Sequence, residues 1–264
     1  MHPNGIITLT TDFGITDPYA GIMRGVVLSV NPAATVVDIT HGIPPHDILN
    51  AAFTVGNSYS YFPEGTVHCA VVDPGVGGRR KNIAIRTARF YFVGPDNGIF
   101  TVIKCREDIQ EIREITNPQY TRSLAAKTFQ GRDVFAPCAA MLSRDAPFAD
   151  IGPVLQEIET IAIPRPKEEN NTLSGEVLSV DSFGNMVTNI TEDRFRSFVG
   201  KRRYAIYFAT ERFSSISETY EEQPSGTPLA IIGSGGYLEI SMSSGNAARY
   251  FMTSAGNSVS IRRY

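Results

Sequence analysis

Several short motifs place a charged or amide side chain at the end of an apolar segment. In Val71-Val72-Asp73-Pro74-Gly75-Val76-Gly77-Gly78-Arg79-Arg80, a strand-like run delivers a carboxylate, and a glycine-rich loop then delivers two guanidinium groups. Glycine adopts backbone conformations that other residues avoid, so a ligand can approach such a loop closely. A carboxylate paired with an arginine can hold a ribose diol or orient a water molecule. The alternative interpretation is a tight turn with a solvated basic tip.

Two other aspartates, Asp12 and Asp181, close apolar segments in the same way, and Asn97 and Asn185 follow in glycine-bearing turns. Aspartate favours such turns because its carboxylate bonds the local backbone, so each residue alone is more typical of a turn than of a ligand contact. Open α/β sheets, however, bind ligands beyond the carboxyl ends of their strands. Together with Asp73, these residues predict a crevice built from loops at a sheet edge.

The motifs of several other chemistries are missing. The four histidines show no HxH or HExxH spacing, so no metal site is predicted. The chain has neither a serine nucleophile elbow nor a Walker A loop. Gly233-Ser234-Gly235-Gly236 could cradle a phosphate, but no helix follows it directly, and a hairpin turn is the favoured interpretation.

Composition narrows the class of protein. The chain has 264 residues, of which 42% are hydrophobic, a formal net charge of −3 and no long apolar run, which predicts a soluble protein with no membrane span. The absence of basic runs argues against nucleic acid as a partner. The N-terminus lacks the features of a signal peptide, and Cys69, Cys105 and Cys138 show no metal-like spacing. We therefore expect buried free thiols and a cytoplasmic location.

The elements that position these residues alternate between strand and helix in the first part of the chain. Apolar and β-branched runs predict strands at residues 5–12, 35–39, 66–72, 82–86, 90–93 and 109–115. Helical spacing predicts helices at residues 19–30, 46–61 and 99–104, and a further helix opened by residues 128–133. Such alternation indicates βαβ units, so we expect an α/β domain over residues 1–163, with a mostly parallel central sheet flanked by helices.

The pattern changes after residues 164–172, a polar, proline-bearing stretch typical of a linker. Residues 173–264 contain short strand candidates separated by glycine turns, at 173–180, 203–209, 229–232, 237–241 and 258–262. This pattern favours a smaller antiparallel, β-barrel-like domain. The sequence therefore predicts an α/β chain of two domains.

A series of motifs, in order along both domains, resembles one family. They are Thr10-Thr11-Asp12-Phe13-Gly14, residues 19–25, Ile39-Thr40-His41-Gly42-Ile43-Pro44-Pro45, residues 72–77, Gly94-Pro95-Asp96-Asn97-Gly98, residues 131–137, Asp181-Ser182-Phe183-Gly184-Asn185 and residues 236–240. The chain is similar to the S-adenosyl-L-methionine (SAM) hydroxide adenosyltransferases, or SAM hydrolases, which are relatives of the SAM-dependent fluorinase and chlorinase. The match spans nearly the whole chain and is more specific than any single motif.

The resemblance implies hydrolysis of SAM to adenosine and L-methionine, by in-line attack of water or hydroxide on C5′ of the ribose. It implies no metal and no cofactor, since SAM is the substrate and a sulfonium leaves as a neutral thioether. The enzyme then needs mainly to position the nucleophile and to replace bulk water. The resemblance also implies a homotrimer, with each substrate between the first domain of one subunit and the second domain of its neighbour.

The resemblance also implies roles for individual residues, at the positions where this chain matches the family's motifs. Asp73 and Arg80 correspond to the aspartate and arginine of the family's water-binding set, and Asp12 corresponds to the residue that holds the ribose hydroxyls. The remaining expected substrate contacts are His46, Asn97, Phe129, Asp181, Phe183, Asn185, Ser234 and the main chain near Asn246 and Ala247.

One position departs from the family. The family's histidine lies in Phe-His-Gly-Arg-Asp, whereas this chain has Phe129-Gln130-Gly131-Arg132-Asp133. Glutamine can hydrogen-bond a water molecule but cannot take its proton near neutral pH. Three outcomes stay open: Asp73 and Arg80 suffice, with hydroxide or late deprotonation and with Gln130 assisting; activity is lowered; or the chain binds SAM or adenosine without turnover. His46 is a candidate compensating base, and its alternative role is stacking or helix capping.

A halogenase is a weaker alternative. The fluorinase has a Tyr-Pro-x-Thr-type segment where this chain has Asp73-Pro74-Gly75-Val76-Gly77, and an acidic residue beside the nucleophile repels halide. The chain also lacks room for the extra loop that the fluorinase carries in its first domain. The sequence therefore favours water as the nucleophile.

Overall fold

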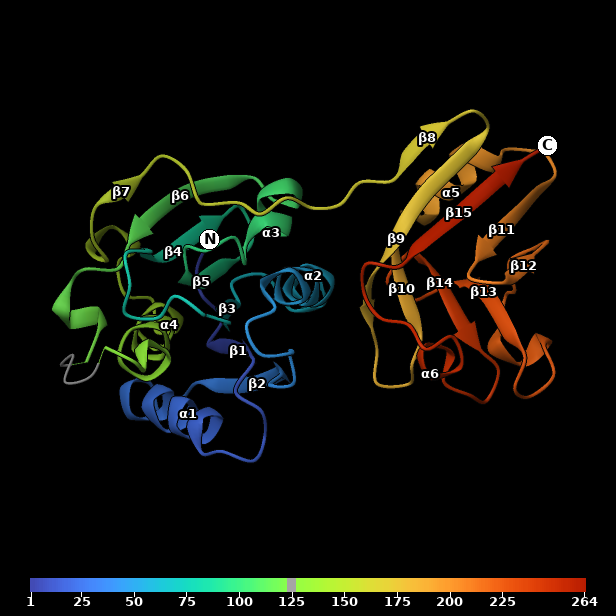
Figure 1. The fold of residues 1–264 in the computed structure, drawn as a ribbon. Coiled ribbons are helices and arrows are strands. Elements are labelled where there is room, and N and C mark those ends of the chain that lie inside the picture. Colours follow the sequence, from blue (N-terminus) through green and yellow to red (C-terminus); the bar gives the residue numbers. More distant parts are fainter. Residues whose placement is uncertain (123–126) are drawn as a thin grey trace. The chain divides into compact units, whose positions relative to one another are not determined.

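The structure is a computed structural model that describes residues 1–122 and 127–264. Its internal contacts divide the chain into two compact units, residues 1–162 and residues 163–264, and each unit contains one sheet (Figure 1). Among the described residues, none of the helices combines the length and the apolar character needed to cross a membrane.

The first unit is built on a seven-stranded sheet in the order β2-β1-β3-β5-β4-β6-β7. Its strands are β1 (Ile6–Thr11), β2 (Thr35–Thr40), β3 (Val67–Val71), β4 (Asn82–Thr87), β5 (Tyr91–Pro95), β6 (Ile109–Glu114) and β7 (Val154–Leu155). The pairs β1–β2, β1–β3 and β3–β5 are parallel, whereas β4–β5, β4–β6 and β6–β7 are antiparallel.

The expectation of a mostly parallel sheet is therefore wrong, because the sheet is mixed. Only a short turn joins β4 to β5, in which Thr87 N–H donates to the carbonyl of Phe90 over 2.9 Å. A connection this short folds the chain back as a hairpin, since a parallel pair needs a crossover of a dozen or more residues. The broad α/β class is correct.

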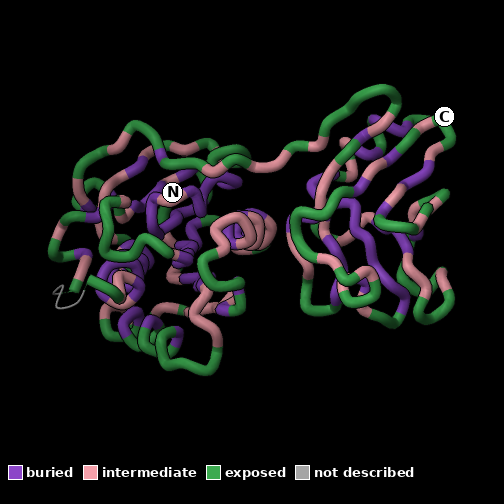
Figure 2. Tube along the Cα trace, viewed as in Figure 1, coloured by how far each residue is buried: buried purple, intermediate pink, exposed green. Residues whose placement is uncertain are grey.

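Helices cover both faces of this sheet, which is why its central strands are buried (Figure 2). The helices are α1 (Tyr19–Val30), α2 (Ile48–Ser58), α3 (Thr101–Arg106) and α4 (Ala136–Ser143), and a π-helical turn (Gly131–Phe135) leads into α4. Residues of α1 and α4 pack with Cys69 and Val71 in one core cluster, and residues of α2 and α3 pack with Ala70 and Val72 in another. Successive side chains of β3, and that of the residue after it, point to opposite faces of the sheet, so they pack alternately into the two core clusters.

The second unit is a nearly barrel-shaped antiparallel sheet of eight strands. Its elements are β8 (Lys167–Glu169), β9 (Thr172–Val180), β10 (Met186–Thr191), α5 (Glu192–Val199), β11 (Tyr204–Phe208), β12 (Glu211–Phe213), β13 (Pro228–Ile232), β14 (Tyr237–Met242), α6 (Ala247–Tyr250) and β15 (Ser258–Arg263). Residues 164–172, which were predicted as a linker, contain β8 and the first residue of β9, and these two segments pair with each other.

The cysteines differ from the expectation at one position. All three are free, and Cys69 and Cys138 are buried, but Cys105 is exposed on α3. Burial raises the pKa of Cys69 to about 12. The apolar residues around Cys105 belong to one face of a short helix, and the cysteine itself lies on the other face.

Candidate active site

Asp12 and Asp73 meet because of the parallel pairing of the strands that precede them. Thr11, at the end of β1, lies opposite Val71, at the end of β3, so the two aspartates leave the sheet at the same edge. Between them is a cavity of about 220 Å³, which we call the Asp73 cavity. It is lined by Asp12, Phe13, His46, Val71, Asp73, Val76, Thr128, Phe129, Gln130 and Gly131.

The loop after Asp73 folds back on itself. Val76 N–H donates to the Asp73 carbonyl over 3.3 Å, and Gly78 N–H donates to the Gly75 carbonyl over 3.0 Å. Gly77 has a φ of +75°, and a Cβ on it would lie 2.9 Å from the carbonyl oxygen of Lys127. Glycine is therefore required at this position, and the folded loop returns Arg80 to the carboxylate seven residues before it.

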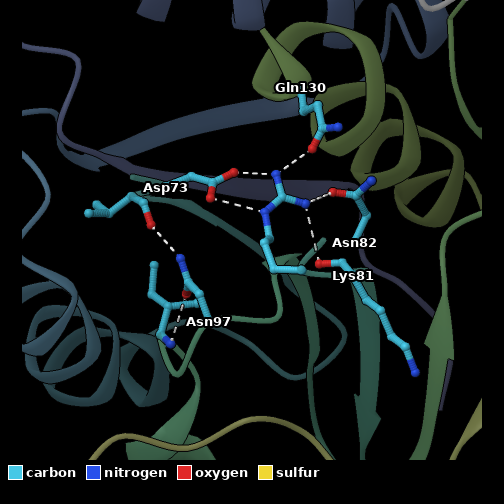
Figure 3. Close-up of polar contacts among 8 residues, drawn as sticks. Asp73, Lys81, Asn82, Asn97 and Gln130 are labelled. Carbon is cyan, nitrogen blue, oxygen red and sulfur yellow. Dashed lines mark hydrogen bonds and ion pairs between the residues drawn. The ribbon is translucent and has the colours of Figure 1, made fainter. Parts of the chain in front are cut away.

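The guanidinium of Arg80 holds three parts of the site together (Figure 3). Its Nε donates to Oδ1 of Asp73 over 3.0 Å, and its Nη2 donates to Oδ2 of Asp73 and to Oε1 of Gln130. Its Nη1 donates to Oδ1 of Asn82 and, over 3.3 Å, to the carbonyl of Lys81. These contacts match the five N–H groups of arginine, so Arg80 acts as a clamp on Asp73 and Gln130.

This clamp determines which way the Gln130 amide faces. Guanidinium has donors and no acceptor, so the atom of Gln130 that contacts Arg80 is the oxygen, and the remaining polar group of that amide is a donor. Asp73 keeps acceptor capacity, because each carboxylate oxygen has more than one lone pair. The site therefore offers a water molecule an acceptor at Asp73 and a donor at Gln130.

His46 lies beside Asp12 and contacts it through the main chain. The N–H of His46 donates to Oδ2 of Asp12 over 3.0 Å, and His46 has a φ of +69°, which is uncommon for a residue other than glycine. The helix-capping alternative for His46 is wrong, because the side chain of Asp47 caps α2 by accepting from Asn50 N–H over 3.0 Å. The helix consequently begins two residues later than predicted.

Phe129 forms part of an aromatic wall. Its ring packs edge-to-face against Tyr19 and Phe13, with centroids 5.2 Å and 5.8 Å away, and the Arg132 guanidinium lies 5.2 Å from its centroid. Such packing holds the ring rigidly beside the cavity.

Asn97 is different, because it does not line the Asp73 cavity. Its amide donates to the Val72 carbonyl over 2.9 Å and so braces the end of β3 from behind (Figure 3).

The second unit contains a separate cavity of about 770 Å³, which we call the Asp181 cavity. The predicted residues Asp181, Phe183, Asn185, Ser234 and Asn246 line it, together with Tyr220, Glu239, Met242, Ser244 and Gly245. The carboxylate of Asp181 accepts from Phe183 N–H over 2.9 Å and from Asn185 N–H over 2.8 Å. The turn expected for this aspartate is thus present, and it fixes the wall of the cavity.

The side chain of Ala247 is fully buried in the core of the unit, and the contact expected from the main chain near Asn246 and Ala247 stays a prediction. The wall of the Asp181 cavity differs from the sequence-based expectation in two residues. Glu239 and Tyr220 line it but were not predicted. Glu239 lies within a motif that supports the resemblance, but a glutamate inside a strand carries no turn signal. Burial raises the pKa of Glu239, and the charge of Asp181 adds to this effect.

Comparisons with known proteins cover both units. The model of the SAM hydroxide adenosyltransferase N-terminal domain matches residues 7–152, and that of the C-terminal domain matches residues 175–260. A protein from Thermus thermophilus named (R)-S-adenosyl-L-methionine hydrolase is 37% identical, over 90% of this chain and 91% of its own length. A protein of the same name from Salinispora arenicola is 34% identical, over 97% of each chain.

The structural comparison agrees. An uncharacterized conserved protein from Thermotoga maritima has a crystal structure that superposes with a TM-score of 0.91 at 34% identity, over 97% of this chain and 100% of its own. Three fluorinases are more distant, at 24% to 27% identity. The chain therefore belongs to the SAM hydroxide adenosyltransferase family.

Proposed function

We propose that this protein is a hydrolase that converts SAM and water into adenosine, L-methionine and a proton. The observation that carries the proposal is the cluster of Asp73, Arg80 and Gln130 beside a small cavity that Asp12 also lines. It is supported by the name shared by relatives that are 34% and 37% identical over nearly their full length.

In the proposed reaction, a water molecule bound at Asp73 attacks C5′ of the ribose in line with the C5′–S bond. Asp73 accepts a hydrogen bond from this water and takes its proton as the new C5′–O bond forms, while the Gln130 amide donates to the water oxygen. The electrons of the breaking bond leave with methionine as a neutral thioether. Arg80 touches neither reacting atom in this scheme, because its donors are already engaged, and it holds Asp73 and Gln130 in position.

Different residues are assigned to the chemically different parts of the substrate. Asp12 is placed to accept hydrogen bonds from the ribose diol, and the His46 main chain holds one of its oxygens in place. We assign the adenine and methionine portions to the Asp181 cavity, in which Phe183, a residue that is 76% exposed, offers its ring and Asn185 offers an amide. The carboxylates of Asp12, Asp73, Asp181 and Glu239 suit a substrate with a cationic sulfonium and an ammonium group.

We further propose that the reaction uses no metal and no cofactor, since a thioether is a good neutral leaving group that needs no Lewis acid. A cytoplasmic location is also a proposal, supported by three free cysteines. The homotrimer, with each site shared between neighbouring subunits, stays a proposal that rests on the family.

A protein that binds SAM or adenosine without turnover is the second candidate, and the observation that favours it is Gln130 at the family's histidine position. A halogenase is less well supported, because Asp73 occupies the nucleophile site and the fluorinases are the more distant relatives.

Chromatography of purified protein incubated with SAM separates these candidates. We expect adenosine and methionine in equal amounts, at a rate that does not depend on chloride or fluoride. Since the relatives are named for the R form, the two sulfonium epimers of SAM should be assayed separately. SAM returned intact from a protein that binds it would support the binding candidate, and a 5′-halogenated nucleoside would support the halogenase.

A further inference from the structure

We infer that His41 is a positioning residue for the substrate, which holds the loop that presents Asp12. The inference rests on the proposed function only in assigning the ribose to Asp12. His41 belongs to the motif Thr40-His41-Gly42-Ile43-Pro44, which begins at the last residue of β2, and neither the proposed chemistry nor the wall of the Asp73 cavity uses its side chain.

The side chain of His41 contacts the residue just before Asp12. His41 is 6% exposed, and its Nδ1 lies 2.8 Å from Oγ1 of Thr11, which is fully buried. The same Oγ1 accepts from Phe13 N–H over 3.2 Å. One hydroxyl therefore connects His41 to both residues that flank Asp12, and it fixes the direction in which the aspartate leaves β1.

The other ring nitrogen faces an ion pair. Nε2 of His41 lies 3.2 Å from Oδ1 of Asp38, within ion-pair distance but outside the geometry of a hydrogen bond. Asp38 is paired with Arg24, whose Nε donates to the same oxygen over 3.0 Å. Burial lowers the pKa of His41, and the charge of Arg24 lowers it further. A lowered pKa favours the neutral imidazole, and Nδ1 can accept from the Thr11 hydroxyl in the tautomer that carries its proton on Nε2.

The main chain completes this link between the ends of β1 and β2. Gly14 N–H donates to the His41 carbonyl over 2.7 Å, and Ile43 N–H donates to the Thr11 carbonyl over 3.4 Å. The β1–β2 register shifts between Leu9 and Thr10, just before the loop, as is common beside active sites. Main-chain bonds thus tie residues 41 and 43 to Gly14 and Thr11, on either side of Asp12, and the His46 N–H bonds the Asp12 carboxylate itself.

The chain offers a matched control in His68 on β3. Its Nδ1 also lies 2.8 Å from the hydroxyl of a β1 threonine, Thr8. His68 is 3% exposed, and its Nε2 has no hydrogen-bond partner among the described residues. Burial lowers the pKa of His68 to about 3. Thr8 lies near the start of β1, whereas Thr11 ends it, so the two histidines share a chemistry and differ in their distance along the strand from Asp12.

The test compares His41→Leu with His68→Leu. We expect His41→Leu to weaken adenosine binding, measured by calorimetry, by about tenfold, as for the loss of one net hydrogen bond. The KM for SAM should rise similarly while kcat changes by less than about threefold, because ground-state and transition-state binding to the ribose are lost together. Thr11→Val should reproduce the effect, and His41→Asn, whose Oδ1 can accept from Thr11, should recover part of it.

His68→Leu should lower thermal stability comparably and leave adenosine affinity and KM unchanged. Equal affinities in His41→Leu and His68→Leu, or a Thr11→Val variant that binds adenosine like the wild type, would overturn the inference. If His41→Leu does not fold, Thr11→Val and His41→Asn still decide it. Wild-type protein that binds adenosine and leaves SAM intact would overturn hydrolysis, whereas the binding comparison would still test His41.

Discussion

Asp73→Asn should lower kcat for SAM hydrolysis by roughly 10²- to 10⁴-fold, the range that a positioned proton acceptor contributes, and should leave adenosine affinity within about threefold. Asparagine keeps the shape of the side chain and an acceptor oxygen for Arg80, but it cannot take a proton from water. Steady-state kinetics of SAM hydrolysis and calorimetry with adenosine measure the two quantities. The split between them is the signature of a group that acts on the nucleophile rather than on the substrate.

The control for this variant addresses stability. Asp73 and Arg80 are 5% and 11% exposed, and loss of one charge in a buried pair destabilises proteins by about 3–5 kcal/mol. Glu107 is also a buried carboxylate, 3% exposed and paired with Arg89, and it does not line the Asp73 cavity. Glu107→Gln should therefore lower the melting temperature without lowering kcat. A fall in kcat that merely follows the melting temperature in both variants would show that Asp73 has no chemical role.

Gln130→Leu should lower kcat by about 100-fold, in line with the loss of one preorganised hydrogen-bond donor at a reacting group. Leucine has a similar volume, but it removes both the oxygen that accepts from Arg80 and the amide N–H group. The kinetic measurement is again kcat against KM for SAM, because a donor to the water oxygen acts on the chemical step.

Asn82→Leu separates the two contributions of Gln130. Asn82 also accepts from Arg80, through Nη1, but it does not line the Asp73 cavity. Asn82→Leu removes an acceptor for Arg80 but leaves the Gln130 amide in place, so it should lower kcat much less, by about tenfold or less. Equal losses in the two variants would mean that Gln130 only braces Arg80.

Gln130→His should keep activity and add an ionisation near pH 6.5 to the rate profile, because imidazole titrates there.

The sequence predicts most of the residues around the Asp73 cavity because its signals are local. A carboxylate at the end of an apolar run marks Asp12 and Asp73, and Gly75 and Gly77 mark the loop that returns Arg80. Asn82 was missed, since its role follows from the distance between β4 and the clamp rather than from any motif. Asn97 carries the same strand-end signal as Asp73, but it supports the end of β3 from outside the cavity.

The errors in the fold have a similar cause. Alternation of strands and helices correctly predicts the parallel pairs around β1, but it contains no information on β4 and β5, which follow each other without a helix and form a hairpin. Residues 164–172 are polar enough to suggest a linker, yet a three-residue edge strand needs little apolar surface. In the second unit, Glu239 faces a cavity from inside β14, where sequence patterns predict only a strand.

In the proposed reaction, water itself, held at Asp73, attacks C5′ of the ribose. The most direct test is a single turnover in H₂¹⁸O, with enzyme in excess over SAM and mass spectrometry of both products. Direct attack predicts that adenosine carries one ¹⁸O at O5′ and that methionine carries none. If the carboxylate of Asp73 attacked instead, hydrolysis of the resulting ester at its carbonyl carbon would release unlabelled adenosine in the first turnover, and that result would rule out direct attack by water.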